Sequence, residues 1–454
     1  MESIGKSMKH HNQRSIRLQR LRCSVQNYDW GKRGTDSLVA RLSALNSSSE
    51  IDPEKPYAEI WMGTHESGPS FLIQNGDENN GFLSIGSENL SLKDWVLENP
   101  KVLGEKVVQK WGSDLPFLFK VLSVAKALSI QAHPDKELAK VLHKFMPNLY
   151  KDANHKPEMA LAVTHFEALC GFISLEELKV VLDNVPEIEE LVGSEDANKV
   201  FDITDRDDEN KVTSVLRSIF THLMSASKEM ITTIITKMKN RLHIESQGKF
   251  FLKALCPEDD LIFKVLWHGR LLTEKEQLVL QLERQYPADV GVISAFFLNH
   301  VNLKPGEALY IGANEPHAYI FGECIELRAG LTPKHMDVNT LCSMLTYKQG
   351  YPKILQGVAL GPYVTRYLPP FDEFEVDCCQ LPQGESAEFP AVPGPSIFVV
   401  TFGEGIIYSS DLKGDVITEG DVLFAPANTQ ISITSASQLQ IYRAGVNSMF
   451  FQAS

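Results

Sequence analysis

The sequence predicts a mainly β fold with an inserted helical domain, in which one β-barrel module is used twice. Short apolar runs broken by Gly, Pro and Asn fill residues 21–172 and return after about residue 289, a pattern typical of β-strands. The stretch between them, residues 173–288, has its apolar residues at helical spacing. A third observation is that two segments, near residues 306–317 and 420–431, resemble each other.

These patterns divide the chain of 454 residues, which is too long for one ordinary core, into four regions. Residues 1–20 are basic and polar and are expected to form a flexible tail. Residues 21–172 and 289–349 are expected to build the first barrel, which residues 173–288 interrupt. Residues 350–454 are expected to form the second barrel.

The helical insertion carries its own start signals. Ser174 with Glu177 and Thr273 with Glu276 are capping-box pairs, each at the head of a predicted helix. The β pattern resumes in the apolar run 290–298, which we interpret as a strand. The insertion is therefore predicted to be all helical and to end shortly before this run.

The internal similarity indicates a duplicated module. Gly306–Asn314 aligns with Gly420–Asn428, because a Gly-acidic pair, apolar positions and Ala-Asn recur in register. The second copy has Ile431 where the first has His317. If His317 binds a metal, the second barrel has lost that site.

Composition excludes several classes of function. The net charge of −14 argues against nucleic acid as a partner, and no apolar run approaches the length of a membrane-spanning helix. The seven cysteines are an odd number without a CxxC motif, which is typical of reduced thiols in the cytoplasm. We therefore expect a cytoplasmic protein that binds neither nucleic acid nor membranes.

Three polar clusters at the edges of apolar runs are candidates for a metal site. Gln131 and His133 are two residues apart in the strand-like segment 127–133, so they point to the same face. Glu158 and His317 begin or border other apolar runs. Two imidazoles, a carboxylate and an amide oxygen form a mixed nitrogen and oxygen set for a divalent metal, of which zinc, manganese and iron are all possible.

Long sequence motifs resemble those of the type I mannose-6-phosphate isomerases, most closely those of plants. The motifs are Val25–Lys32, Tyr57–His65, Leu115–Val124, Ala127–Lys136, Asn154–Ala160, Pro316–Tyr319 and Arg328–Lys334. The resemblance implies a cupin-type catalytic barrel, an inserted helical domain and a C-terminal cupin-like barrel without metal. It also implies a monomer with one Zn²⁺ per chain, bound by Gln131, His133, Glu158 and His317.

The activity that the resemblance implies is an aldose–ketose isomerisation. It converts the sugar phosphate D-mannose 6-phosphate into D-fructose 6-phosphate and back, by proton transfer between C2 and C1 through an enediol(ate). Such an enzyme supplies mannose for GDP-mannose synthesis and, in a plant, for ascorbate.

Further residues receive roles from the same resemblance or from their neighbours. Arg328 is implied to be catalytic, and its permanent charge suits an enediolate or a phosphate. His155 and Lys156, next to Glu158, are candidates for proton transfer or substrate orientation. The residues we expect to contact substrate are Ser129, Lys136, Tyr319 and Lys334, with the two lysines as candidates for the phosphate.

One segment departs from the family pattern. Family members carry a longer link with Ser-Asp-Asn upstream of the arginine, whereas here Gly322–Leu327 leads directly into Arg328, with Cys324 where the Asp is expected. A shift of strand register by an odd number of residues would turn Arg328 to the opposite face. The alternative function is therefore a catalytically impaired variant, or a cupin that only binds zinc and sugar phosphate.

Overall fold

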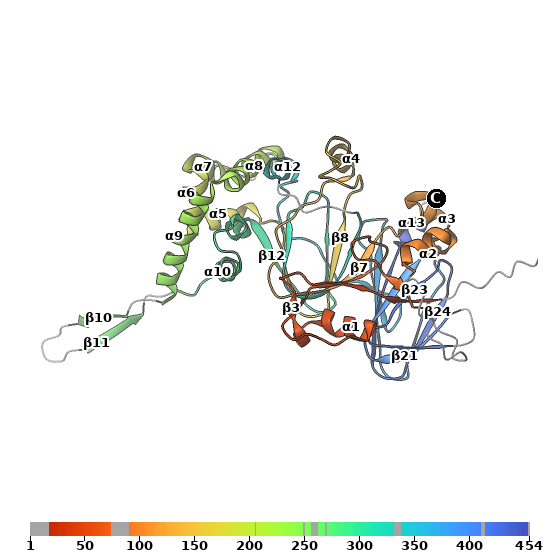
Figure 1. Cartoon of the computed structure of the whole chain (residues 1–454). Helices are drawn as coiled ribbons and strands as arrows, with labels where there is room; N and C mark the ends of the chain where they lie inside the picture. Colours follow the sequence, from red (N-terminus) through yellow and green to blue (C-terminus); the bar gives the residue numbers. More distant parts are fainter. Residues whose placement is uncertain are drawn as a thin grey trace, which may run out of the picture.

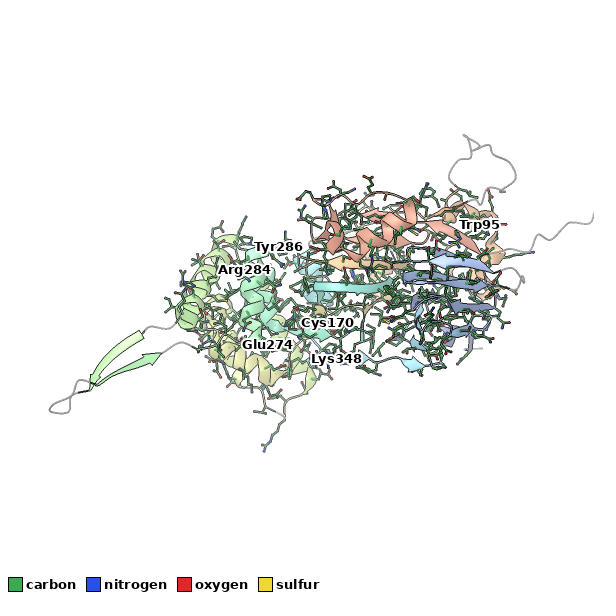
Figure 2. The ribbon with its side chains drawn as sticks, turned by 90° about the horizontal axis from the view of Figure 1, so that it is seen from below. Trp95, Cys170, Glu274, Arg284, Tyr286 and Lys348 are labelled. Carbon is green, nitrogen blue, oxygen red and sulfur yellow. The ribbon has the colours of Figure 1, made fainter. Side chains whose placement is uncertain are left out.

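The computed structural model describes residues 18–73, 90–204, 206–247, 250–255, 262–267, 270–330, 337–409 and 414–452. A helical region lies at one end of the molecule, and the two β regions follow it side by side (Figure 1). In the view from below, Cys170 lies near the junction of the helical and β regions, and Trp95 lies near the opposite end (Figure 2).

The first barrel is built on a nine-stranded antiparallel sheet. Its main path runs in the order β15 (Ile354–Leu355), β13 (Ala308–Ile311), β8 (Glu158–Ala162), β14 (His317–Arg328), β7 (Leu118–Val124), β5 (Glu59–Met62) and β2 (Ser24–Gln26). Off this path, β9 (Phe166–Phe172) pairs with both β12 (Leu298–Leu303) and the first half of β14. The long strand β14 therefore belongs to both layers of the barrel.

The second barrel combines an eight-stranded and a four-stranded sheet. The larger sheet has the order β16 (Val358–Ala359), β17 (Val364–Tyr367), β18 (Glu375–Leu381), β25 (Leu439–Gly445), β20 (Ser396–Phe402), β23 (Val422–Ala425), β1 (Gln19–Arg22) and β6 (Phe71–Leu72). The smaller has the order β19 (Ser386–Phe389), β24 (Ile431–Ser435), β21 (Glu404–Tyr408) and β22 (Asp415–Thr418).

Short elements connect and cover these sheets. They are β3 (Lys32–Arg33), β4 (Pro56–Tyr57), α1 (Leu38–Ser47), α2 (Leu92–Glu98), α3 (Glu105–Trp111), α4 (Lys136–Phe145) and α13 (Ser448–Gln452), with single turns at Gly34–Asp36, Pro100–Leu103 and Ala295–Phe297.

Two domain boundaries differ from those expected from the sequence. Gln19 and Arg20, assigned to the flexible tail, belong to β1, which pairs with β23 of the second barrel; residues 1–17 lie outside the described part. Arg20 also forms a salt bridge with Asp421 at 2.6 Å. At the other boundary, β15 extends the first sheet beyond residue 349 by pairing with β13. Strand pairing between distant segments, which a local pattern does not reveal, causes both differences.

The insertion consists mostly of helices, and both predicted capping boxes are present. Its helices are α5 (Leu175–Asn184), α6 (Pro186–Val192), α7 (Ser194–Phe201), α8 (Glu209–Ser225), α9 (Lys228–Gln247) and α10 (Glu274–Gln285). It is not all helical, because β10 (Phe250–Leu255) and β11 (Ile262–Trp267) form an antiparallel hairpin that projects from the molecule (Figure 1).

The strand predicted over residues 290–298 is also wrong. Val290–Ser294 forms α11, which Asp289 caps, and β12 begins only at Leu298. A short apolar run is compatible with either a buried helix or a strand, and packing against the helical core decides between them here. A further helix, α12 (Val338–Met344), contacts α8 of the insertion although it follows the first barrel in sequence.

The strand faces define separate cores. Alternate residues of β7, β8 and β14, such as Val121, Met159 and Ile325, face the second barrel and share one hydrophobic cluster with its Val399 and Phe424. The other residues of these strands face the interior of the first barrel. Because both faces of this sheet are covered, any polar side chain on the interior face is buried.

The structure confirms the internal repeat. Gly306 and Gly420 have φ of 87° and 90°, and Asn314 and Asn428 both have φ of 62°. The strands between them, β13 and β23, pair in the same way with β8 and β20. None of the helices in the described ranges is long and apolar enough to cross a membrane.

Candidate metal centre

Three of the four predicted ligands come together at the mouth of the first barrel. His133 follows the short bridge between Gln131 and His317, Glu158 is the first residue of β8, and His317 is the first residue of β14. One possible ligand atom from each of His133, Glu158 and His317 lies within 4.8 Å of the others. All three side chains are buried, with exposed fractions of 3–4%.

The Glu158 carboxylate lies between the two imidazoles, and the hydrogen bonds leave a lone pair of His317 directed at it. His317 donates from Nδ1 to the carbonyl oxygen of Glu315 at 3.0 Å, so its Nε2 carries a lone pair. That Nε2 has no hydrogen-bond partner and lies 3.3 Å from Oε2 of Glu158. Nε2 of His133 lies 3.3 Å from the other carboxylate oxygen. Electron-rich atoms that face one another in a buried site fit a cation between them.

Gln131 is held beside His317 through the backbone. The amide of each residue donates to the carbonyl of the other at 2.8 Å, and the Gln131 side chain is half-buried. Segment 127–133 is not the full strand that its pattern predicted, since only Gln131 forms a bridge. Spacing within one segment could not reveal that the partner of Gln131 is His317.

Lys156 adds a buried positive charge to this group. Its Nζ lies 2.8 Å from Oε1 of Glu158 and 3.2 Å from Nε2 of His133. Burial lowers the pKa of Lys156. Burial would raise the pKa of Glu158, but Lys156 and His133 hold it well below its usual range. Burial and the Lys156 ammonium lower the pKa of His133 to about 3, so its imidazole is neutral and able to bind a metal.

Arg328 lies on the same face as Glu158. The two residues are direct partners in the β14–β8 pairing, so their side chains point to the same side of the sheet. The Arg328 guanidinium lies 5.7 Å from the centre of the Trp61 ring, and its Nε is buried without a hydrogen-bond partner. The direct lead from Gly322–Leu327 into Arg328 therefore leaves this side chain inside the barrel.

Comparisons with known proteins agree with this fold. The catalytic-domain model of phosphomannose isomerase type I matches residues 18–175, and the helical insertion domain model matches residues 191–298. Mannose-6-phosphate isomerase 1 of Arabidopsis thaliana is 60% identical over 442 residues, covering 96% of this chain and 95% of the relative. The human mannose-6-phosphate isomerase is 38% identical, covering 93% and 97%.

The chain belongs to the type I phosphomannose isomerase family. A crystal structure of mannose 6-phosphate isomerase bound with zinc and yttrium shares its fold, with a TM-score of 0.73 and 24% identity over 95% of this chain and 99% of that one. The apo form from Salmonella typhimurium superposes similarly, with a TM-score of 0.72, 24% identity and the same coverage. The two barrels with a helical insertion are consistent with the cupin fold of this family.

A buried charge network that the sequence did not predict lies beside the candidate metal site. Lys120, which is 4% exposed, lies 3.0 Å from both Glu59 and Glu326 on the interior face of the barrel. Its Nζ is also 5.2 Å from the centre of the Trp61 ring. Burial raises the pKa of Glu326, although Lys120 opposes this. The sequence held one indication of this network, which is that Lys120 lies in the middle of the apolar run Leu115–Val124.

The other predicted residues occupy different places. Nε2 of His155 lies 3.0 Å from Oε1 of Glu373, which belongs to the second barrel. Tyr319 is 4% exposed, and its hydroxyl has no hydrogen-bond partner. Ser129 and Lys136 are exposed, the latter at the start of α4. Lys334 lies outside the described residues.

A cavity of about 620 Å³ borders segment 127–133, and Gln131 and His133 are among its lining residues. It is lined by Ile130 and Ala318, which pack against the helical core, and by Phe220 of α8. Ser129 lines this cavity as well. The cavity therefore extends from the helical core to two of the predicted ligands, whereas Tyr319 packs in the barrel interior and does not line it.

The second barrel lacks the three ligands at the equivalent places. Ser396 occupies the position of Glu158, because its pairing with Ala425 corresponds to the pairing of Glu158 with Ile311. Ile431 occupies the position of His317. The carbonyl that accepts from Asn428 belongs to Val392, whereas the one that accepts from Asn314 belongs to His133. The buried ion pair of each barrel has the opposite arrangement of charges. Arg443 of β25 takes the place of Glu326, and its partner Asp377 of β18 takes the place of Lys120.

Proposed function

We propose that this chain interconverts D-mannose 6-phosphate and D-fructose 6-phosphate as an aldose–ketose isomerase. The observation that carries the proposal is the 60% identity to an Arabidopsis mannose-6-phosphate isomerase over 96% of the chain. The buried group His133, Glu158 and His317 supports it, since its ligand atoms suit a divalent metal.

We propose that one Zn²⁺ binds to Gln131, His133, Glu158 and His317. Glu158 is the single anionic ligand in this set, so a bound zinc ion keeps a net positive charge and can stabilise negative charge that develops on a sugar oxygen. The hydrogen bond from His317 Nδ1 to Glu315 orients the other ring nitrogen toward the site. The second barrel, with Ser396 and Ile431, favours one ion per chain.

The residues around the metal group suggest a division of work. Lys156 is buried against Glu158 and has a lowered pKa, so we assign it the proton transfer between C2 and C1. Arg328 has a permanent charge on the interior face and is proposed to stabilise the enediolate. His155 is paired with Glu373, which favours an orienting role. The Tyr319 hydroxyl, which has no hydrogen-bond partner, is proposed to donate a hydrogen bond to the sugar.

We propose that the phosphate is bound outside the barrel interior, where charged side chains stay hydrated. Lys136 is exposed at the first turn of α4, where its ammonium can pair with a phosphate. Ser129 and Lys334 remain candidates from the sequence for contacts to substrate.

The second candidate function is a chain that binds zinc and sugar phosphate without turnover. The shortened segment before Arg328, with Cys324 in place of the expected Asp, is the feature that favours it. The position of Arg328 opposite Glu158 and the high identity to named isomerases favour the active enzyme.

A coupled assay that detects fructose 6-phosphate formed from mannose 6-phosphate tests the proposal, together with a measurement of zinc per chain. We expect turnover that a chelator removes and that added zinc restores. Bound zinc without turnover, with a rise in melting temperature on adding mannose 6-phosphate, would establish the binding-only alternative.

The cellular role is also a proposal. The six cysteines in the described part of the chain are free, which fits a reducing compartment such as the cytoplasm. The product of the reverse reaction, mannose 6-phosphate, would supply GDP-mannose synthesis and, in a plant, ascorbate. We propose that the chain acts as a monomer, and sedimentation or light scattering would measure this.

A further inference from the structure

Asn314 lies in the turn between β13 and β14, three residues before the ligand His317. Its backbone is left-handed, with φ of 62°, a conformation that Asn adopts more readily than most residues. The turn itself therefore explains an Asn or a Gly at this position. It does not explain the side-chain contacts that Asn314 makes.

Those contacts join two of the ligand-bearing segments. The Asn314 amide donates to the carbonyl oxygen of His133 at 2.7 Å, and its side-chain Oδ1 accepts from the backbone amide of Asp135 at 3.1 Å. Its Nδ2 donates to Oδ2 of Asp135 at 3.0 Å. If the Asn314 side-chain amide were turned over, its NH₂ group would face the Asp135 backbone N–H and its oxygen would face the Asp135 carboxylate. The network therefore fixes the orientation of this amide.

Asp135 is itself held in place by the helix that follows. Its Oδ1 accepts from the backbone amide of Leu138, which makes it the N-cap of α4. The bonds of Asn314 thus attach the segment of His133 to the start of α4 on one side and to the start of β14 on the other. Because the imidazoles of His133 and His317 lie with ring centres 5.1 Å apart, a small shift of either segment changes their spacing.

The second barrel shows the same turn without this attachment. Asn428 has the same φ of 62°, and its amide donates to the carbonyl oxygen of Val392 at 2.7 Å. Its side chain is exposed, and among the described residues it has no hydrogen bond like those of Asn314. The left-handed turn therefore occurs in both barrels. The side-chain hydrogen bonds to Asp135 occur in the first barrel, which carries the predicted ligands.

We propose that Asn314 is a positioning residue of the metal site: its side chain, through Asp135, sets the spacing between His133 and His317. This inference rests on the zinc site proposed above. Neighbouring hydrogen bonds that orient metal ligands typically change affinity by about 10- to 100-fold when they are removed.

The first test compares Asn314→Gly with Asn428→Gly. Glycine keeps the left-handed turn in both variants and removes only the side chain. Zinc affinity of the metal-free protein is measured by competition with a chelating dye, beside the melting temperature. We expect about tenfold weaker zinc binding for Asn314→Gly and wild-type affinity for Asn428→Gly.

The second test exchanges the two partners. Asn314→Asp places two carboxylates together and is expected to weaken zinc binding, whereas the double variant Asp135→Asn with Asn314→Asp restores the bond with donor and acceptor reversed. Asn is as good an N-cap as Asp, so α4 keeps its start. Recovery of zinc affinity in the double variant is a response that a general loss of stability would not produce.

The outcomes separate the two proposals. If the wild-type chain binds no zinc, the proposed metal site itself is wrong. If the wild type binds zinc and Asn314→Gly binds it equally well, the metal site stands and the positioning role of Asn314 is refuted. The same conclusion follows if the exchanged double variant is no better than Asn314→Asp alone.

Discussion

Single ionisable side chains inside the first barrel have their protonation fixed by burial and by their immediate neighbours. His133 is kept neutral, Glu158 is kept ionised, and Glu326 has a raised pKa, although all three are almost fully buried. The Lys156 ammonium lies against Glu158 and His133, whereas Lys120 lies against Glu326 and opposes the rise of its pKa. Because buried charges are costly when unpaired, each of these residues also affects stability.

Replacing His133 tests the effect of acid on the metal-free protein. Its pKa is lowered from 6.5 to about 3, so between these values the unfolded chain binds the proton and acid favours unfolding. From pH 6.5 to pH 5 this group should cost about 2 kcal/mol. We expect His133→Gln to lose less stability than the wild type over this range, measured by urea unfolding of the metal-free proteins. Parallel pH dependence of the two proteins would contradict the lowered pKa.

Replacing Lys120 tests the buried network. Lys120→Met leaves Glu59 and Glu326 buried without their shared partner, and we expect a loss of about 3–5 kcal/mol in the free energy of unfolding at pH 7. The control is Lys126→Met, which removes an exposed pair with Asp29 at 3.5 Å and should cost about 0–1 kcal/mol. Similar losses in the two variants would show that the network contributes little.

At the scale of elements, β14 connects the metal site to the charged interior. Its first half, which begins with His317, pairs with β9, and its second half, which ends at Arg328, pairs with β7 and β8. Gly322 lies where the partner of β14 changes from β9 to β7, and its φ is 107°. A Cβ atom there would lie 2.2 Å from the carbonyl oxygen of His165. Glycine is therefore required both by the backbone conformation and by the close approach of another strand.

A substitution at Gly322 should lower the free energy of unfolding by more than backbone strain alone would. Gly112→Ala is the control, since Gly112 has φ of 77° and open space around it, and it should cost about 1–3 kcal/mol. Gly322→Ala adds a displaced backbone, and we expect it to exceed the control by at least about 2 kcal/mol in chemical denaturation. Equal costs would mean that β14 can move away from His165 without penalty.

At the scale of the whole molecule, the second barrel supports the site without holding a metal ligand of its own among the described residues. It contributes Glu373, whose carboxylate contacts His155 at 3.0 Å, just before Lys156 and Glu158. It also covers the outer face of the sheet that carries Glu158 and Arg328. The duplicated module has thus kept its shape while its ligand positions hold Ser396 and Ile431.

A pair of adjacent variants measures this contribution. Glu373→Gln removes the charge that pairs with His155, and we expect kcat/KM to fall about tenfold with zinc content unchanged. Asp372→Asn is the matched control, because Asp372 pairs with the partly exposed Lys110 on the surface. Steady-state kinetics that are the same for both variants would restrict the second barrel to a structural role.

The sequence predicted the local features well. Both capping boxes are present, because a cap depends on residues three apart in the chain. The repeated turn at Asn314 and Asn428 was visible for the same reason. In contrast, the strand β1 at Gln19 depends on a partner near residue 424, and the helix at Val290 depends on packing against the insertion.

By itself, the sequence predicted the candidate ligands Gln131, His133, Glu158 and His317, and it indicated two similar barrels and the family. The tertiary structure decided which polar residues share the interior with them. It placed Arg328 opposite Glu158, Lys120 between two carboxylates, and Glu373 against His155. The physical reason is that the residue type alone decides whether a side chain can bind a metal. Strand register and burial instead depend on pairings between segments far apart in the chain.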